Sequence, residues 1–98
     1  MAEEKKDENV VFIGTKPFMN YVTSVVMQFT TKNRSEVVIK ARGKHIKTAV
    51  DVVEVIRKKF LKDKEIRIKN ISIDSEEMQN KEGRTVTVSS IEVTLVKK

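Results

Sequence analysis

The sequence predicts an α+β fold, in which one small domain has the element order βαβαββ, a mixed sheet and a long C-terminal β-hairpin. Two short apolar runs, each followed by a glycine and then a helical pattern, predict two parallel strands joined by right-handed crossovers. The last third alternates in hydropathy over two long segments, which predicts an antiparallel hairpin. The chain has 98 residues, 39% of them hydrophobic, which is enough for one domain with one modest core.

The first strand and the first helix are predicted between residues 10 and 29. Residues 10–13 are continuously apolar and stop at Gly14, which is typical of a strand buried on both faces. Pro17 suits the first turn of a helix, because the N–H group that it lacks has no helical partner there. A loop is expected over residues 30–34. The apolar residues at helical spacing are Phe18, Val22, Val25, Val26 and Phe29.

The second strand, residues 37–39, is also predicted to be buried on both faces, and Gly43 follows it. A long helix is expected over residues 44–60. Val52 and Val55 lie off its main apolar stripe, so the helix has more apolar surface than one sheet contact requires. We interpret this surplus as a contact with a second subunit. The predicted stripe consists of Ile46, Ala49, Val50, Val53, Ile56 and Phe60.

The C-terminal hairpin is predicted to have strands over residues 65–75 and 84–96, with a polar loop between them. Its apolar residues change face partway along each strand, near Asn70 and near residues 89–90, as happens at a bulge or strong twist. A pairing that sets Ile73 opposite Val86 would align the two changes. The base would then join the core, the outer half would face a second subunit, and the tip would project as an arm. The alternative is an ordinary hairpin that lies on its own domain.

The charges divide the chain into an acidic start and a basic remainder. Residues 1–9 carry four carboxylates and two lysines. They are predicted to form a disordered tail, which leaves residues 10–98 as the domain. The formal net charge of the whole chain is +6, which favours a polyanionic partner, although a lysine-rich solvated surface would give the same value.

The composition argues against several classes of protein. Without cysteine there is neither a disulfide framework nor a thiolate metal site. No apolar run approaches the roughly 20 residues of a membrane span, and the polar start is not a signal peptide, so we expect an intracellular protein. His45 is the only histidine, so one chain cannot assemble a histidine triad or a histidine metal site. We therefore expect no enzyme activity, no cofactor, no metal and no small-molecule substrate.

Basic residues gather at the predicted strand-to-helix loops. Parallel strands bring both loops to the same edge of the sheet. Cations at helix N-termini oppose the helix dipole, whereas a bound phosphate would accept hydrogen bonds from both the amides and the cations. The pattern predicts a phosphate-binding edge, and a solvated run of charge is the alternative. These residues are Lys16, Lys40, Arg42, Lys44 and Lys47.

The first helix and the aromatic residues say less about function. The outward side of the first helix is uncharged, which fits either a contact with a macromolecule or a plain polar surface. The aromatic residues mostly occupy predicted core positions and do not form the exposed stacking pattern of a single-strand binder. The uncharged outward residues are Asn20, Thr23, Ser24 and Gln28.

Three motifs stand in order along the chain. VVFIG leads into KPFMNYV at residues 10–22, and VIKARGK at residues 38–44 precedes AVD at residues 49–51. GR at residues 83–84 is followed by SSIEV at residues 89–93 and by a final lysine pair. Over about residues 9–98 the chain therefore resembles the Alba family of abundant archaeal chromatin proteins.

The resemblance implies a two-layer domain, similar in fold to the C-terminal domain of translation initiation factor three. It implies a protein that binds double-stranded DNA largely without sequence preference, compacts the chromosome in the cytoplasm, and also binds RNA. It would act as a homodimer, or as a heterodimer with a paralogue, and assemble further along DNA. An RNA-binding protein or a subunit of a ribonuclease P-like particle is the alternative.

The resemblance also implies roles for particular residues. Phe60 would join neighbouring dimers, although its place late in an amphipathic helix equally fits core packing. Thr15 stands where many members have the first lysine of a pair, so acetylation in this loop would fall on Lys16. Lys47-Thr48 also departs from the usual basic position. The residues expected to contact nucleic acid are Lys16, Asn20, Lys40, Arg42, Lys44, Lys47 and Arg84.

Overall fold

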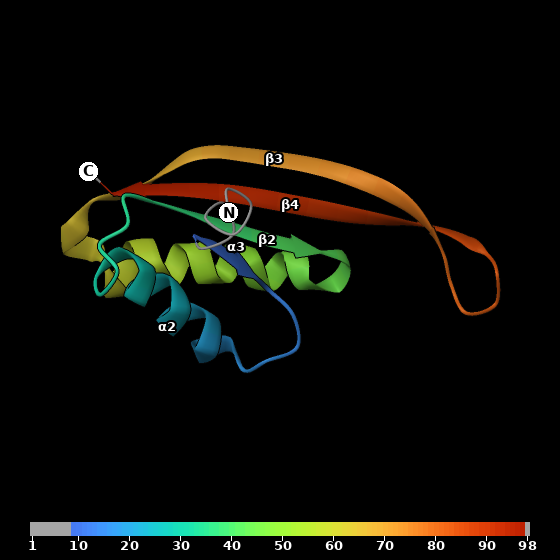
Figure 1. The fold of residues 1–98 in the computed structure, drawn as a ribbon, viewed down its shortest axis with the longest axis horizontal. Coiled ribbons are helices and arrows are strands. Elements are labelled where there is room, and N and C mark those ends of the chain that lie inside the picture. The colour runs from blue at the N-terminus through green and yellow to red at the C-terminus, as the bar shows by residue number, and fades with distance from the viewer. Residues whose placement is uncertain (1–8, 98) are drawn as a thin grey trace, which may run out of the picture.

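The computed structural model describes residues 9–97 and has the predicted βαβαββ order (Figure 1). The α+β fold class is therefore confirmed. The first half contains strand β1 (Val10–Phe12), helix α2 (Phe18–Phe29) and strand β2 (Glu36–Arg42). The second half contains a 3₁₀ turn (Gly43–His45), helix α3 (Ile46–Val55) with a π-helical continuation (Ile56–Phe60), a second 3₁₀ turn (Lys62–Lys64), and strands β3 (Ile66–Gln79) and β4 (Thr85–Lys97).

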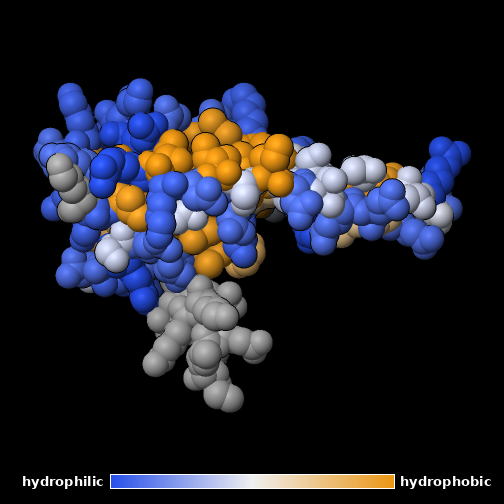
Figure 2. All heavy atoms as spheres, turned by 90° about the horizontal axis from the view of Figure 1, so that it is seen from above, coloured by the Kyte–Doolittle hydropathy of each residue, from blue (hydrophilic) through white to orange (hydrophobic). Residues whose placement is uncertain are grey.

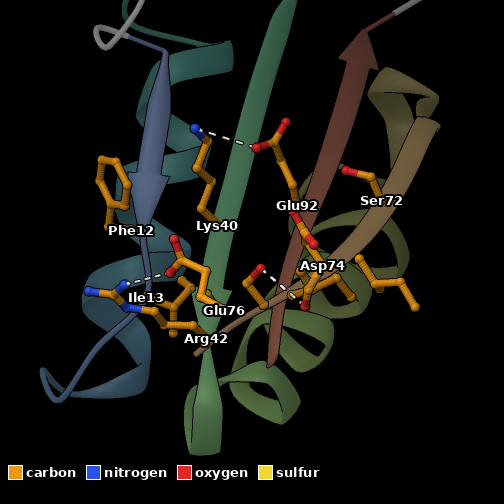
Figure 3. A pocket seen from close by; sticks show the side chains of 12 residues that line it. Phe12, Ile13, Lys40, Arg42, Ser72, Asp74, Glu76 and Glu92 are labelled. Carbon is orange, nitrogen blue, oxygen red and sulfur yellow. Dashed lines mark hydrogen bonds and ion pairs between the residues drawn. The ribbon is translucent and has the colours of Figure 1, made fainter. Parts of the chain in front are cut away.

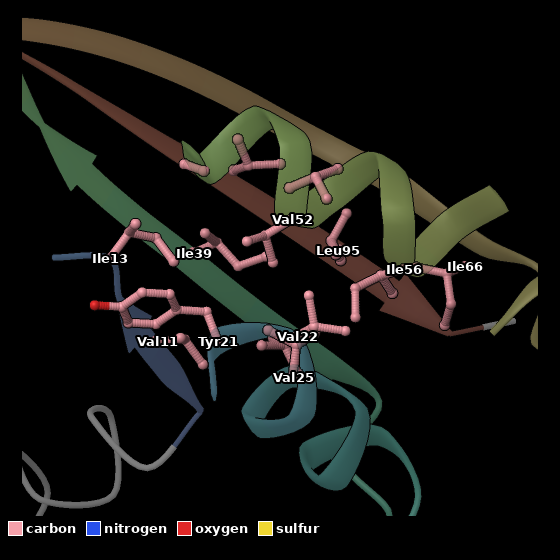
Figure 4. Packing of buried hydrophobic residues seen from close by; sticks show 14 of the residues in the cluster. Val11, Ile13, Tyr21, Val22, Val25, Ile39, Val52, Ile56, Ile66 and Leu95 are labelled. Carbon is pink, nitrogen blue, oxygen red and sulfur yellow. The ribbon is translucent and has the colours of Figure 1, made fainter. Parts of the chain in front are cut away.

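The four strands form one mixed sheet in the order β1-β2-β4-β3. β1 pairs parallel to β2, while β4 pairs antiparallel to both β2 and β3. Since β1, β2 and β3 run in the same direction, right-handed crossovers place both helices on one face of the sheet. Figure 1 shows α2 and α3 together on that side, and Figure 4 shows the core side chains between the helices and the strands. The largest fully buried side chains are Phe29, Ile39, Ile56, Leu95, Val22, Val25, Val37 and Val52.

The prediction that the first two strands are buried on both faces was wrong. Val11 and Ile39 face the helices and are buried, but Val38 is half-buried and Phe12 is 64% exposed. Both helices cover the same face, so the opposite face of the sheet is open to solvent. Continuous apolar runs in this chain therefore do not indicate a sheet covered on both sides.

Helix α3 has the predicted surplus of apolar surface, but on different residues. Val52 lies in the core, whereas Val50 is 44% exposed and Phe60 is 51% exposed. Phe60 leaves the predicted stripe because the helix changes its winding at Ile56. There the N–H of Leu61 donates to the carbonyl of Ile56, five residues earlier, at 2.9 Å, whereas an α-helix would join residues four apart.

The predicted register of the hairpin was wrong. Ile73 pairs with Ile91 instead of Val86, and Val86 pairs with Met78. The register shifts between Ile68 and Asn70, so a change of face on β3 is confirmed. It does not coincide with the change on β4, because Ser89 lies opposite Ser75, farther along the hairpin. Residues 76–79, predicted as loop, continue the strand.

The outer part of the hairpin projects beyond the sheet as an arm (Figure 1). Arg42, paired with Ser90, is the last residue of β2 in contact with β4. From Ser75 to Gln79 the strands pair only with each other, over about 17 Å at 3.4 Å per residue. The alternative of a hairpin lying on its own domain is therefore wrong for this part.

The start of the described chain is attached to the sheet. The Asn9 side-chain amide donates to the backbone carbonyl of Glu36 at 3.2 Å, and the backbone carbonyl of Asn9 accepts from the N–H of Val38 at 2.9 Å. Asn9 therefore belongs with the domain and not with the predicted tail. The remainder of the tail prediction, residues 1–8, lies outside the described residues.

Candidate nucleic-acid interface

Both strand-to-helix connections lie at the same edge of the sheet, which we call the basic edge. The parallel register aligns Phe12 with Lys40, so the ends of β1 and β2 point the same way. Lys16 lies in the first connection, Arg42 ends β2, and Lys44 lies in the 3₁₀ turn that follows. All three side chains are exposed. The topology therefore brings together cations that are far apart in the sequence.

The helical turns at the basic edge lack the usual N-terminal acceptors. Pro17, Arg42 and His45 occupy the cap positions of α2, the 3₁₀ turn and α3, and none makes a side-chain capping hydrogen bond. None of these three helical segments has an acidic residue in its first turn. The positive ends of the helix dipoles are thus met by cations, an arrangement that an anion from outside would stabilise.

Tyr21 shapes the first loop of the basic edge. Its hydroxyl oxygen accepts hydrogen bonds from the N–H groups of Gly14 at 2.9 Å and Lys16 at 2.8 Å. The ring is buried in the core, so the hydroxyl fixes the loop relative to α2. The hydropathy pattern predicts Tyr21 as a core aromatic and does not reveal this second role. The role could have been anticipated from chemistry, because the hydroxyl of a buried tyrosine usually has a hydrogen-bond partner.

Replacing Tyr21 by Phe is expected to loosen this loop. Two partly buried amides would lose their acceptor, which costs about 1–3 kcal/mol for an unsatisfied group. Each kcal/mol lowers Tm by about 4–8 °C in a domain of this size, so thermal unfolding followed by circular dichroism should detect the change. An unchanged Tm would mean that the hydroxyl does not hold the loop. Thr23→Ala, an exposed change on the same helix, is the control.

Two of the predicted contact residues are engaged by carboxylates. The ammonium of Lys40 lies 3.4 Å from the carboxylate of Glu92, and the guanidinium of Arg42 lies 3.6 Å from that of Glu76 (Figure 3). They border a hollow of about 620 Å³ on the open face, which Asp74 also lines. The loop sequence contains no acid, but the hairpin supplies three. Exposed ion pairs of this kind contribute little free energy, so a phosphate can displace them.

The remaining predicted residues of the body occupy separate places. Lys47 donates to the carboxylate of Asp51 at 2.8 Å, and this hydrogen bond, with the nearby negative charge, raises the pKa of Lys47. Lys47 thus has a partner on the solvated side of α3, as the spacing of four predicts. Asn20 is exposed and lines a different hollow, together with Lys16.

Arg84 lies at the tip of the arm, away from the basic edge. The side-chain oxygen of Asn80 accepts from the N–H groups of Glu82 at 2.9 Å and Arg84 at 3.0 Å. Gly83 adopts a φ of +81°, which favours glycine. Asn80 therefore defines the tip that presents Arg84, whereas the sequence pattern predicts only a polar loop there.

Two further properties of residues 9–97 concern metal sites and membrane-spanning helices. Within this range no group of three or more His, Asp or Glu side chains is arranged to hold a metal ion. None of the helices in it is long and apolar enough to cross a membrane.

These features define a class of protein, namely small two-layer α+β domains with basic strand-to-helix loops at one sheet edge and a projecting hairpin arm. The family model named Alba matches residues 9–75. Because that match covers more than half of the chain, the protein belongs to the Alba family.

Individual relatives and structures agree with this assignment. "DNA/RNA-binding protein Alba 1" of Archaeoglobus fulgidus is 50% identical over 91 residues, which cover 93% of this chain and 98% of the relative. "DNA/RNA-binding protein Alba" of Methanococcus maripaludis is 43% identical over 90 residues, 92% of this chain and 99% of the relative. The structure of Alba from Thermoplasma volcanium has a TM-score of 0.81 at 47% identity, covering 91% of this chain and 100% of that one. ALBA1 from Trypanosoma brucei, with a TM-score of 0.68 at 23% identity over 92% of this chain and 69% of that one, shares the fold.

Proposed function

We propose that this protein binds nucleic acid through the phosphate backbone, coats double-stranded DNA largely without sequence preference, and also binds RNA. The observation that carries the proposal is the basic edge. There, helical N-termini without acidic or capping side chains open beside Lys16, Arg42 and Lys44. Phosphate is the ligand that satisfies both the amides and the cations. Relatives named as DNA/RNA-binding proteins support the same assignment.

The proposed assembly is a dimer, formed with a second copy or with a paralogue. Val50 is 44% exposed on α3, and Ile71 and Ile73 are 52% and 78% exposed on the helix-facing side of β3. Figure 2 shows a hydrophobic area beside the base of the arm, while the arm itself is mostly hydrophilic. A second subunit packed on this area would bury the apolar surface. The dimer would then have two basic edges, which could both bind the same duplex.

Two other exposed residues have proposed roles in this assembly. Phe60 is 51% exposed at the end of the π-helical continuation of α3, where it would contact the next dimer along the DNA and promote compaction of the chromosome. Arg84 would be carried by the arm toward a minor groove, where readout depends on groove width and A·T content. Lys16 is exposed, and its acetylation would remove one phosphate-binding charge.

Competition binding tests the proposal. Matched duplex DNA, duplex RNA and single strands would be compared at one stated salt concentration, and duplex binding would then be measured across a salt series. We expect similar affinities for unrelated duplex sequences and a linear fall of log affinity with log salt. Duplex affinity that does not change with salt would rule out a phosphate interface.

A further inference from the structure

A groove runs along the outer side of β1, the edge strand farthest from β3, and lies between β1 and α2. It encloses about 650 Å³, which is in the range of ligand-binding pockets. Its lining combines cations at the two ends of α2, hydroxyls along the middle of the helix, and apolar side chains beside them. These are Lys16 and Lys32, Thr23 and Ser24, and Phe12 and Met27.

Phe12 is an unusual member of this lining, because the core does not require it. Its neighbours Val11 and Ile13 face the helices and are 8% and 7% exposed, whereas Phe12 stands on the open face and is 64% exposed. The ammonium of Lys40 lies 5.8 Å from the centre of its ring (Figure 3). An exposed ring beside a cation is the kind of surface on which a nucleobase stacks.

The charge of the groove differs from that of the hollow next to it. Among the described residues that line the groove, the charged ones are Lys16 and Lys32, and no carboxylate is present. The neighbouring hollow on the open face is lined by three carboxylates, Asp74, Glu76 and Glu92, and by only two cations, Lys40 and Arg42. A polyanion would therefore be attracted more strongly to the groove than to the centre of the open face.

We propose that the groove binds a short unpaired stretch of nucleic acid. A base stacks on Phe12, phosphates lie near Lys16 and Lys32, and the hydroxyls of Thr23 and Ser24 contact base edges. Helix α2 has 12 residues and is about 18 Å long, so the groove takes only a short segment of a strand. Bases inside a duplex cannot reach the ring, so the groove selects single strands. This goes beyond the proposed function and rests on it only in sharing Lys16.

Methionine methyl groups provide the test. The chain has four methionines, of which Met27 lines the groove and Met78 lies on the arm. The full chain labelled with ¹³C at the methionine methyls would be titrated with a six-nucleotide oligouridylate. We expect the Met27 signal to shift while the Met78 signal stays in place. An abasic strand of the same length, which keeps the phosphates and lacks the bases, should bind much more weakly.

Substitutions separate this site from the duplex interface. Base stacking on an aromatic side chain is typically lost on replacement by alanine, so Phe12→Ala should weaken single-strand binding by about 5- to 150-fold. Lys32→Ala should also weaken it, and duplex affinity should be unchanged in both. Met78→Ala, on the arm, is the matched control. Because Phe12 is exposed, its loss should leave the fold intact.

Several results would overturn the proposal. One is a Met27 signal unmoved by saturating oligouridylate, and another is an abasic strand that binds as tightly as the complete one. A Met27 shift caused by an extended peptide, and not by the strand, would assign the free edge of β1 to peptide binding. Should duplex binding fail while oligouridylate still moves Met27, the proposed duplex function falls and the groove assignment stands.

Discussion

Removing Lys16 and Arg42 together is expected to weaken duplex binding by about 10³- to 10⁴-fold at 0.1 M salt. In the proposed dimer the change Lys16→Ala/Arg42→Ala removes four phosphate contacts, each of which contributes about 0.9 to the slope of log affinity against log salt. The slope should therefore flatten by about 3.6. The loss should be similar for unrelated duplex sequences, because phosphate contacts position the protein and do not specify bases.

A matched variant controls for the loss of charge. Lys62→Ala/Lys64→Ala also removes two cations per chain, but from the turn before β3. That turn lies where β1 and β2 begin, at the end of the sheet away from the basic edge. It should change the slope far less. Thermal unfolding should show both variants folded, since Lys16, Arg42, Lys62 and Lys64 are exposed. Equal slopes for the two variants would mean that general charge, and not the basic edge, holds the DNA.

Introducing carboxylates at the proposed dimer surface is expected to separate the subunits. Val50→Asp/Ile73→Asp places a charge on each of two exposed apolar positions, and the buried interface would have to desolvate it. Sedimentation equilibrium at micromolar concentration should give twice the chain mass for the original protein and the single chain mass for the variant. Loss of the second basic edge should lower duplex affinity by about 10²- to 10⁴-fold.

Two variants show whether this effect is specific to the surface. Met78→Asp puts the same charge on the opposite face of the arm and should leave the dimer intact. Phe60→Ala should also remain dimeric and lose cooperative coating of DNA. Its Tm should hardly change, whereas a core Phe→Ala change costs about 3–5 kcal/mol. A Val50→Asp/Ile73→Asp protein that still sediments as a dimer would contradict the proposed interface.

Topology was the most predictable part of the structure. Helical and alternating periodicity identified the six main elements, and the parallel direction of the first two strands placed both loops at one sheet edge. Periodicity could not show that Phe12 is exposed, because the same apolar run is compatible with an edge strand and with a central strand. It also could not show that helix α3 changes its winding at Ile56, which turned Phe60 out of the expected stripe.

The hairpin register depended on local chemistry that hydropathy does not record. Several pairings of β3 and β4 align apolar residues, and the side chain of Asn80 selects one by closing the tip onto Glu82 and Arg84. The error in register then affected the site. It hid the approach of Glu76 to Arg42, which is produced by pairing between strands. The basic loops were therefore predictable, while the acids that accompany them were not.

The π-helical segment at Ile56–Phe60 has a consequence for how this chain tolerates changes in length. Geometrically, a π turn is an α-helical turn that has gained one residue. Deleting one residue here would allow ordinary α-helical winding to resume, with Ile56 still in the core, and would turn the following side chain to another side of the helix. The outward position of Phe60 is thus set by the count of residues in the turn. It should survive many substitutions in this segment, but not a deletion.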